Sequence, residues 1–504
     1  MPKSLEKRIS TLLQQDSHRQ KTAFLSILSG KTSVSSSGYP YLSEISFRTF
    51  LQEFPHLFRE GQILISWIGQ FEAKLESVRL FSPTELVSLQ RAVFVLRQIV
   101  QSAAVCAPSD LWILRHVLSV HCALGLTNLY KTGAQFDLET TAAKYGLDAR
   151  HLSWDFSLLH SRGYLEVRNK MWQWCISSAA KDVLQKITEL PKEFLTDWVE
   201  LFVKLLSGNS SPEEQEQIAR FLTYEDRTSP SARWEASYFQ MEVGYRLVPM
   251  ILALHVLRIR ENASEGVSLT KLLPASTPEM VKLLNDAGII QDDSTLTALG
   301  VRVLHRAPGP FGIIHAYLPY MRVLADRLSG KPGQTWVQRG KNIAASQDAN
   351  RKTFEMANDS LDHFVADHEL TYRVFIEHAL GQGEAVRQRW KRSGEKEIQY
   401  FGADLEDAAI DRALLLQQQG VLPPNMIFIR KADIANPQIV IDAVRQNGFA
   451  TEGAIMFVGN GFHEIRGQTN EKIVSVFRQY CDAGMIVVFT EESALGDKDL
   501  LSTG

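Results

Sequence analysis

The sequence predicts a doubly wound α/β domain with a parallel sheet in its C-terminal third, behind a mainly helical region. The first observation is an alternation of short apolar runs with helical segments from residue 330 onward, which is typical of a parallel sheet. The second is the recurrence of apolar residues every three or four positions before that point, which is typical of amphipathic helices. The third is size, because 504 residues, 45% hydrophobic and 22% charged, can form about two to four globular domains.

Five apolar runs are the expected strands of the sheet. In chain order they read YRVFI, EIQYFG, MIFI, AIMFV and MIVVF. The segments EAVRQRW, LEDAAIDRALLLQQQG, NPQIVIDAVRQNG and NEKIVSVFRQYCDAG separate them as helices. Right-handed crossovers through such helices give a doubly wound sheet, which binds ligands at the carboxyl ends of its strands. The sequence ends soon after the fifth run, so we expect a sheet that lacks its last strands, through truncation or completion by a partner.

Residues 1–105 are expected to be helical, with a Ser/Gly-rich loop, SGKTSVSSSGYPY, beginning at Ser29. The clearest helix starts near Ser82. Ser82 is its expected N-cap, Pro83 suits the first turn, and Glu85 completes a capping box. Apolar residues then recur along one face as far as Val100.

Two segments predict winged-helix modules, each with two helices followed by a hairpin. The first is Asp137 to Ser177, and the second begins at Gly266. A winged helix can place its second helix in a DNA groove, but groove binding needs a basic face. Neither candidate helix has one: Asp148 and Asp155 stand against Arg150 and His151 in the first, and Glu279, Asn285 and Asp286 stand against Lys282 alone in the second. We therefore expect both modules to serve in packing or dimerisation and not in DNA binding. The predicted division is a helical region 1–105, a first winged-helix domain 106–235, a second, dimerising one 236–330, and the α/β domain 331–504.

Bulk properties restrict the partners and the compartment. The net charge of -3 gives no polyanion-binding signature, so no nucleic-acid partner is expected. No apolar run is long enough to cross a membrane, and the N-terminus lacks the apolar core of a signal peptide. The four cysteines are scattered without a C-x-x-C pair, which predicts a reducing cytoplasm and no thiolate metal site.

A glycine-rich turn follows the first expected strand. Glu377, Ala379, Gly381 and Gly383 stand at alternate positions of an acidic-x-G-x-G-x-G pattern in which alanine replaces the first glycine. Glycines at a strand-to-helix turn let the backbone bend sharply and approach a ligand closely.

The ends of the next strands carry polar and apolar residues suited to an adenosine. Asp404 ends the second strand, where a carboxylate can accept both ribose hydroxyls. Asp433 and Ile434 end the third strand and pair a polar with an apolar group for an adenine edge and face. Leu405 and Asn460, after the second and fourth strands, are assigned to the same site.

The motif E-x-A-x-G-x-G, followed by GADLE, AD and an apolar fourth strand, resembles a class I S-adenosylmethionine (SAM)-dependent methyltransferase. Position three past Gly383 is Val386, whereas a nicotinamide-binding domain would show glycine there. The segment from Tyr238 is similar to the winged-helix dimerisation domain of small-molecule O-methyltransferases. TFEMANDSLDHF resembles their substrate-wall segment, which implies that Phe354 and Met356 line the substrate pocket.

A His-Glu pair follows the fourth strand in VGNGFHEIRG. A zinc-protease H-E-x-x-H motif is excluded, because Gly467 stands where the second histidine would be. The resemblance instead implies that His463 is a general base and that Glu491, after the fifth strand, orients it, with Glu492 as a substitute. An imidazole suits this role because it exchanges a proton near neutral pH. The family's W-S-D is absent, and Arg466 in its place is a candidate for an anionic substrate group or a salt bridge to Glu464.

The sequence therefore predicts a cytoplasmic SAM-dependent methyltransferase of a small molecule, most simply at oxygen, that forms a homodimer and holds no metal. One alternative is a carbon or nitrogen methyltransferase in which His463 has another acid-base role. A second is a winged-helix regulator that senses SAM without catalysis.

Overall fold

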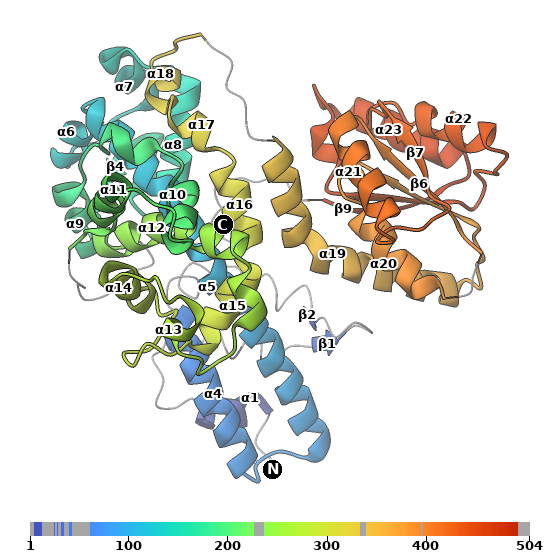
Figure 1. The fold of residues 1–504 in the computed structure, drawn as a ribbon, viewed down its shortest axis with the longest axis horizontal. Coiled ribbons are helices and arrows are strands. Elements are labelled where there is room, and N and C mark those ends of the chain that lie inside the picture. The colour runs from blue at the N-terminus through green and yellow to red at the C-terminus, as the bar shows by residue number, and fades with distance from the viewer. Residues whose placement is uncertain are drawn as a thin grey trace. The chain divides into compact units, whose positions relative to one another are not determined.

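The structure is a computed structural model that describes residues 5–12, 25, 28, 32–34, 40–42, 61–225, 236–332, 339–394 and 397–491. They form two compact units that meet in the chain near residue 340 (Figure 1). The first unit is almost entirely helical, and the second is an α/β sheet domain.

The helical unit is built from one long helix, α5, and many shorter ones, with two small pairs of strands. Its elements are α1 (Leu5–Leu12), β1 (Thr32–Val34), β2 (Pro40–Leu42), α4 (Gly61–Ser77), α5 (Pro83–Ala123), α6 (Leu126–Lys131), α7 (Leu138–Tyr145), α8 (Ala149–Ser161), β3 (Leu165–Arg168), β4 (Met171–Trp174), α9 (Ser178–Lys186), η1 (Lys192–Leu195), α10 (Trp198–Leu206), α11 (Pro212–Leu222), α12 (Tyr238–Val256), η2 (Ile259–Asn262), α13 (Leu269–Leu272), α14 (Pro278–Asp286), α15 (Ala298–Arg306), α16 (Pro308–His315), α17 (Leu318–Met321) and α18 (Leu324–Leu328). β1 and β2 pair within the segment that the sequence predicted to be a loop, so that prediction was wrong there.

The long helix α5 is the central element of this unit. It begins as predicted, with Pro83 at its start and a capping box between Ser82 and Glu85. It then continues without a break across residue 105, and one apolar core joins residues from both sides of 105 and of 235. The expected boundaries at these two positions therefore do not coincide with gaps in the packing. By length and composition α5 is the one helix of the described part that could span a membrane, but half of its most apolar stretch is buried inside the protein.

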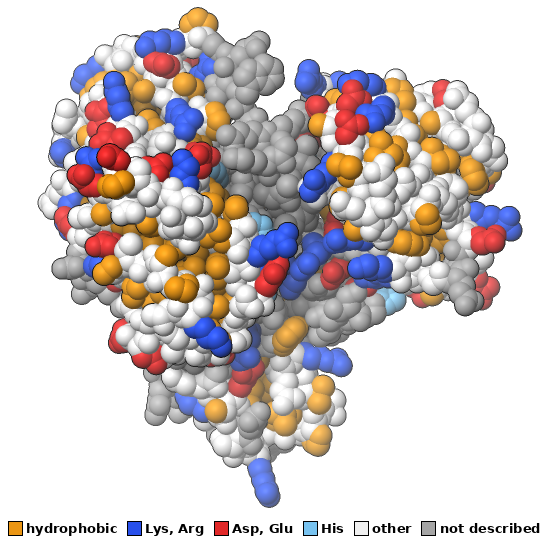
Figure 2. Space-filling view, in the orientation of Figure 1, with side chains coloured by type: hydrophobic (Ala, Val, Ile, Leu, Met, Phe, Trp, Pro, Cys, Tyr) orange, Lys and Arg blue, Asp and Glu red, His pale blue; other side chains and the backbone are white. Residues whose placement is uncertain are grey.

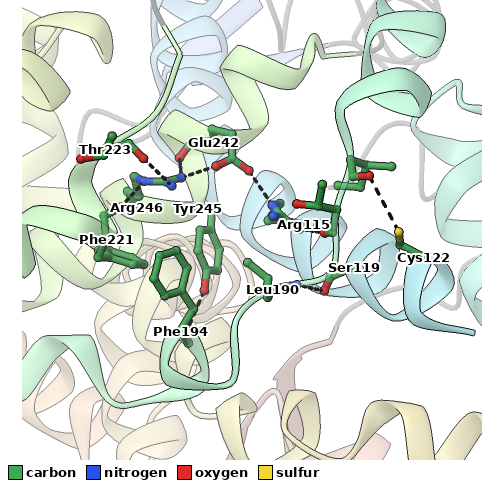
Figure 3. A network of polar contacts seen from close by, with 12 residues as sticks. Arg115, Ser119, Cys122, Leu190, Phe194, Phe221, Thr223, Glu242, Tyr245 and Arg246 are labelled. Atoms are coloured by element: carbon green, nitrogen blue, oxygen red, sulfur yellow. Dashed lines mark hydrogen bonds and ion pairs between the residues drawn. The ribbon is translucent and has the colours of Figure 1, made fainter. Parts of the chain in front are cut away.

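A buried ion triad joins α5 to α12 (Figure 3). Glu242 of α12 lies between Arg115 of α5 and Arg246 of α12, and all three residues are at most 5% exposed. Arg115 also donates to the carbonyl of Thr188, at 2.9 Å, and Arg246 donates to the carbonyl of Phe221. Both guanidinium groups thus share a carboxylate and bond to backbone carbonyls inside the core, as buried charges require partners.

The first predicted winged-helix module has the expected order of elements, α7, α8, β3 and β4, and Phe136 forms a further bridge to Trp172. The expectation that Asp155 contributes acidic charge to the exposed face of α8 was wrong, because Asp155 is buried. Its carboxylate is 2.9 Å from the buried His121 imidazole. The second module shows two isolated antiparallel bridges, Ile290 to Leu296 and Ser268 to Thr295, in place of the predicted hairpin strands. On the face of each unit visible in Figure 2, basic and acidic side chains are interspersed.

The α/β unit confirms the predicted parallel sheet. Its elements are α19 (Arg339–Asp367), β5 (Val374–His378), α20 (Glu384–Ser393), β6 (Gln399–Asp404), α21 (Asp407–Gln418), β7 (Ile427–Arg430), α22 (Gln438–Gln446), β8 (Ile455–Gly459), η3 (Phe462–Glu464), α23 (Asn470–Asp482) and β9 (Ile486–Thr490). The strands are parallel in the order β7-β6-β5-β8-β9. The order reverses direction beside β5, so the carboxyl ends of β5 and β8 flank the point where such sheets bind ligands.

Alternate residues of β5 pack in two different apolar cores. Phe375 packs in a core with α19, α20 and α21, whereas Ile376 packs in a core with α22 and α23. The same alternation sends Glu377 toward α20 and His378 toward α23. The sheet is therefore covered on both faces, and its site is built at the carboxyl edge.

Candidate active site at the carboxyl edge of the sheet

The predicted glycine-rich turn follows β5 directly. Ala379, Gly381 and Gly383 all have left-handed backbones, with φ of 61°, 53° and 75°. Glycine adopts such angles freely, whereas an alanine there is strained by about 1 kcal/mol. The strained Ala379 lies directly after β5, where the chain leaves the sheet, and strain of this kind is frequent at functional sites.

The Glu377 side chain is buried between the glycine-rich turn and α20 and does not face solvent. It is 1% exposed and accepts hydrogen bonds from the backbone N–H groups of Val386, at 2.8 Å, and Ala385, at 3.4 Å. Burial is the main cause that raises the pKa of this carboxyl to about 8, and these two hydrogen bonds oppose the rise. In the structure Glu377 thus holds the first turn of α20 in place.

Asp404, at the end of β6, is tied to the same turn. Its Oδ2 accepts from the N–H of Gly381 at 2.9 Å, and its Oδ1 accepts from the N–H of Glu406 at 2.9 Å. The neighbouring Leu405 side chain is 41% exposed, an apolar surface at the edge where a ligand would lie.

The loops after β5, β7 and β8 converge at Gly461. A Cβ atom added there would lie 2.9 Å from both Ala379 Cβ and Ile434 Cδ1, so only glycine fits without displacement. Ile434 is accordingly buried against the loops, whereas Asp433 beside it is exposed and accepts from the N–H of Ala435 at 2.8 Å. The structure therefore brings four predicted ligand-binding segments to one edge.

His463 stands on the short turn η3 after β8 and is hydrogen-bonded to Glu491. Its Nδ1 is 2.7 Å from Glu491 Oε1, and its side chain is 55% exposed. The other carboxylate oxygen of Glu491 accepts from the N–H groups of Phe462, at 2.7 Å, and His463, at 3.3 Å. Glu464 is farther away, with 3.8 Å between its Oε1 and His463 Nε2. Arg466 is exposed, and Glu492 lies outside the described residues.

Three further residues were assigned to the site from the sequence: Phe354, Met356 and Asn460. Phe354 of α19 is 3% exposed and packs on Phe457, and its ring lies against Gly459 at the end of β8. Met356 is only partly buried. Asn460 contacts Thr490 of the neighbouring strand through its backbone, at 2.8 Å, and its side chain, at 3.4 Å.

His378 is a buried histidine that the sequence reasoning did not single out. It is fully buried, with Nδ1 3.2 Å from the Tyr480 hydroxyl and Nε2 3.2 Å from the carbonyl of Ala432. Burial lowers its pKa to about 4, so the ring is neutral at physiological pH. It connects β5 to α23 and to the start of the β7 loop, and its position after Glu377 on a strand was the available signal.

The residues present fit an adenosyl ligand. A left-handed glycine turn, the Asp404 carboxylate bonded to that turn and an exposed leucine adjoin one another at this edge. No group of three or more His, Cys, Asp or Glu side chains among the described residues is arranged to hold a metal ion. The histidine-carboxylate pair beside this edge can exchange a proton with a bound molecule.

No protein-family model matches the chain, and no curated protein sequence matches it. Among solved structures, the DszA carbon methyltransferase shares 13% identity and a TM-score of 0.37 over 78% of this chain and 73% of that one. The CurJ carbon methyltransferase shares 11% identity and a TM-score of 0.32 over 80% of this chain and 77% of that one. PigF, solved with SAH, shares 13% identity and a TM-score of 0.22 over 77% of this chain and 84% of that one. At TM-scores this low, the likenesses carry no argument about what this chain does.

Proposed function

We propose that the protein is a SAM-dependent methyltransferase that acts on a small molecule. The observation that carries the proposal is the hydrogen bond between His463 and Glu491 at the same sheet edge as the glycine-rich turn. A base and a cofactor cradle are then offered by neighbouring loops of one parallel sheet, where such sheets bind their ligands.

Asp404 would hold the ribose hydroxyls, and the turn Ala379–Gly383 would approach the rest of the cofactor with its backbone. Leu405 and Asp433 would contact the adenine face and edge. Glu377 would act from beneath by fixing the first turn of α20. When bound, SAM supplies an electrophilic methyl group on a sulfonium centre, and the residues of the chain bind it, orient the acceptor and move the proton.

The tautomer of His463 follows from its partner. Because Nδ1 faces the Glu491 carboxylate at 2.7 Å, Nδ1 carries the hydrogen and Nε2 has the lone pair. Nε2 would take the proton of the acceptor as the new bond to the methyl carbon forms. Glu491 would stabilise the imidazolium that results, as an orienting carboxylate does in other histidine-based sites.

If His463 acts as a general base, the acceptor atom must carry a proton that is removed during methyl transfer. A hydroxyl oxygen is the first candidate, and a carbon made acidic by an adjacent carbonyl is the second, since an imidazole serves both. The two are separated by incubating the protein with methyl-labelled SAM and panels of phenols and of β-dicarbonyl compounds, then locating the label by mass spectrometry. His463→Ala should lower kcat by about 100- to 10,000-fold on the true acceptor class. Near-full activity of that variant would reject a general-base role.

Assembly and location are part of the same proposal. We expect the helical unit to dimerise through its second helix-rich module, 236–330, and the protein to work in the cytoplasm. Sedimentation at a concentration above and below about 1 μM should show a dimer that dissociates on dilution. The regulator alternative predicts salt-dependent DNA binding at physiological salt, and a methyltransferase predicts none.

A further inference from the structure

We infer that Asn460 and Thr490 form a clamp that positions the His463–Glu491 pair, and that Asn460 is a positioning residue and not a cofactor ligand. The inference rests on the proposed function for its kinetic part only. It goes beyond the role that the sequence suggested for Asn460, because the structure turns this side chain toward β9.

The clamp joins the end of β8 to the end of β9. The N–H of Asn460 donates to the carbonyl of Thr490 at 2.8 Å, which continues the parallel pairing of the two strands past Gly459. The Thr490 hydroxyl donates to Asn460 Oδ1 at 3.4 Å. Residue 490 is therefore held by residue 460 through both main chain and side chain.

The chain segments that follow Asn460 and Thr490 carry the two residues of the proposed catalytic pair, His463 and Glu491. Glu491 follows Thr490 and accepts three hydrogen bonds from the turn after Asn460: from the N–H of Phe462, the N–H of His463 and the His463 ring. A shift of the end of β9 by one residue along β8 would remove all three bonds at once. The pairing of β8 with β9 sets their register, and the bonds between Asn460 and Thr490 extend it to the residue that precedes Glu491.

The backbone at residue 460 explains why asparagine stands there. Its φ is 51°, in the left-handed region, which glycine tolerates best and asparagine tolerates better than other residues. Asparagine combines that tolerance with a side-chain acceptor for the Thr490 hydroxyl. Glycine would keep the conformation and lose the side-chain bond, so the two contributions can be separated by substitution.

An apolar anchor beneath the turn supports the clamp. The Phe462 ring is 5% exposed and lies 4.8 Å from the Phe477 ring and 5.5 Å from the Phe489 ring, measured between centroids. Phe489 immediately precedes Thr490 on β9. The turn bearing His463 is therefore held from below by packing and from the side by the clamp, as a precise catalytic group requires.

The test compares Thr490→Val, which removes the hydroxyl at nearly constant shape, with Thr490→Ser, which keeps it, and adds Asn460→Gly. The first readout is the nitrogen-15 NMR signal of the His463 Nδ1–H group in the full-length protein without cofactor. In Thr490→Val and Asn460→Gly its exchange with water should be about 2- to 10-fold faster, whereas Thr490→Ser should resemble the wild type.

The second readout is binding and turnover. Thr490→Val and Asn460→Gly should lower kcat by about 2- to 10-fold and leave the Kd for SAM within about 2-fold. Weakened SAM binding by Asn460→Gly with an unchanged His463 signal would overturn the inference and restore a cofactor role. An unchanged signal in both variants would overturn it as well. If the wild type itself fails to bind SAM, the proposed function fails, but the NMR comparison still decides whether the clamp holds His463.

Discussion

The Oδ2 atom of Asp404 accepts a hydrogen bond from the backbone N–H of Gly381 at 2.9 Å, so the end of β6 holds the turn that follows β5. The other oxygen holds the N–H of Glu406. An asparagine has a single acceptor oxygen and cannot make both bonds. Asp404→Asn should therefore lower the stability of the α/β unit by about 1.5 to 3 kcal/mol, measured as a shift in the urea midpoint. Asp442→Asn, an exposed change on α22, is the matched control, and equal midpoints for the two variants would contradict the structural role.

Glu377 should make stability depend on pH. Its folded-state pKa, about 8, lies above the ordinary 4.5, mainly through burial. Its contribution to stability is therefore fully present below pH 4.5 and is lost as the pH rises toward 8, by up to about 1.4 kcal/mol per pH unit. Glu377→Gln cannot ionise, so the difference in unfolding free energy between wild type and variant should fall across this window. A difference that does not change with pH would show that the carboxyl ionises normally when folded.

Gly461 and Ala379 should be energetically coupled. Gly461→Ala would place its Cβ 2.9 Å from Ala379 Cβ, and overpacking of this kind costs about 1 to 3 kcal/mol. Ala379→Gly removes the opposing methyl group and relieves a positive-φ alanine. In a double-mutant cycle, Gly461→Ala should cost at least about 0.5 kcal/mol less in a protein that already carries Ala379→Gly than in the wild type. Additive costs would mean that the two loops do not touch.

The buried triad gives a prediction for the helical unit. Glu242→Ala leaves Arg115 and Arg246 without their shared carboxylate and should destabilise the unit by about 3 to 5 kcal/mol, measured by thermal or urea unfolding. Replacing Glu242 by Leu together with both arginines by Met removes every charge and should cost less. If the triple variant is less stable than Glu242→Ala, the ion triad contributes net stability beyond relief of unpaired charge.

The sheet was predictable because each of its strands and turns is marked by a short segment of the sequence. The five strands show as apolar runs, and glycines mark the turn at Gly381 and Gly383. The parallel order then places Asp404, His463 and Glu491 at one edge. The pairing of His463 with Glu491 was expected from the resemblance to O-methyltransferases, and in the structure the two side chains lie 2.7 Å apart after the neighbouring strands β8 and β9.

The direction of individual side chains was not predictable, because it depends on packing between distant segments. Glu377 turned out to lie under the turn, since alternate residues of β5 face opposite helical layers. Asn460 faces Thr490 because β9 pairs with β8 beyond Gly459. Asp155 is buried because it pairs with His121 on α5, and no pattern within α8 records that contact.

The central claim is that this sheet edge binds SAM, and titration calorimetry of the full-length protein tests it most directly. The account predicts saturable binding of SAM and of its demethylated product at a single site. It also predicts affinity about 10- to 100-fold weaker in Asp404→Ala, which loses hydrogen bonds to a charged acceptor, and unchanged affinity in Asp442→Asn. Absence of binding by the wild type, or equal affinity in wild type and Asp404→Ala, would contradict it.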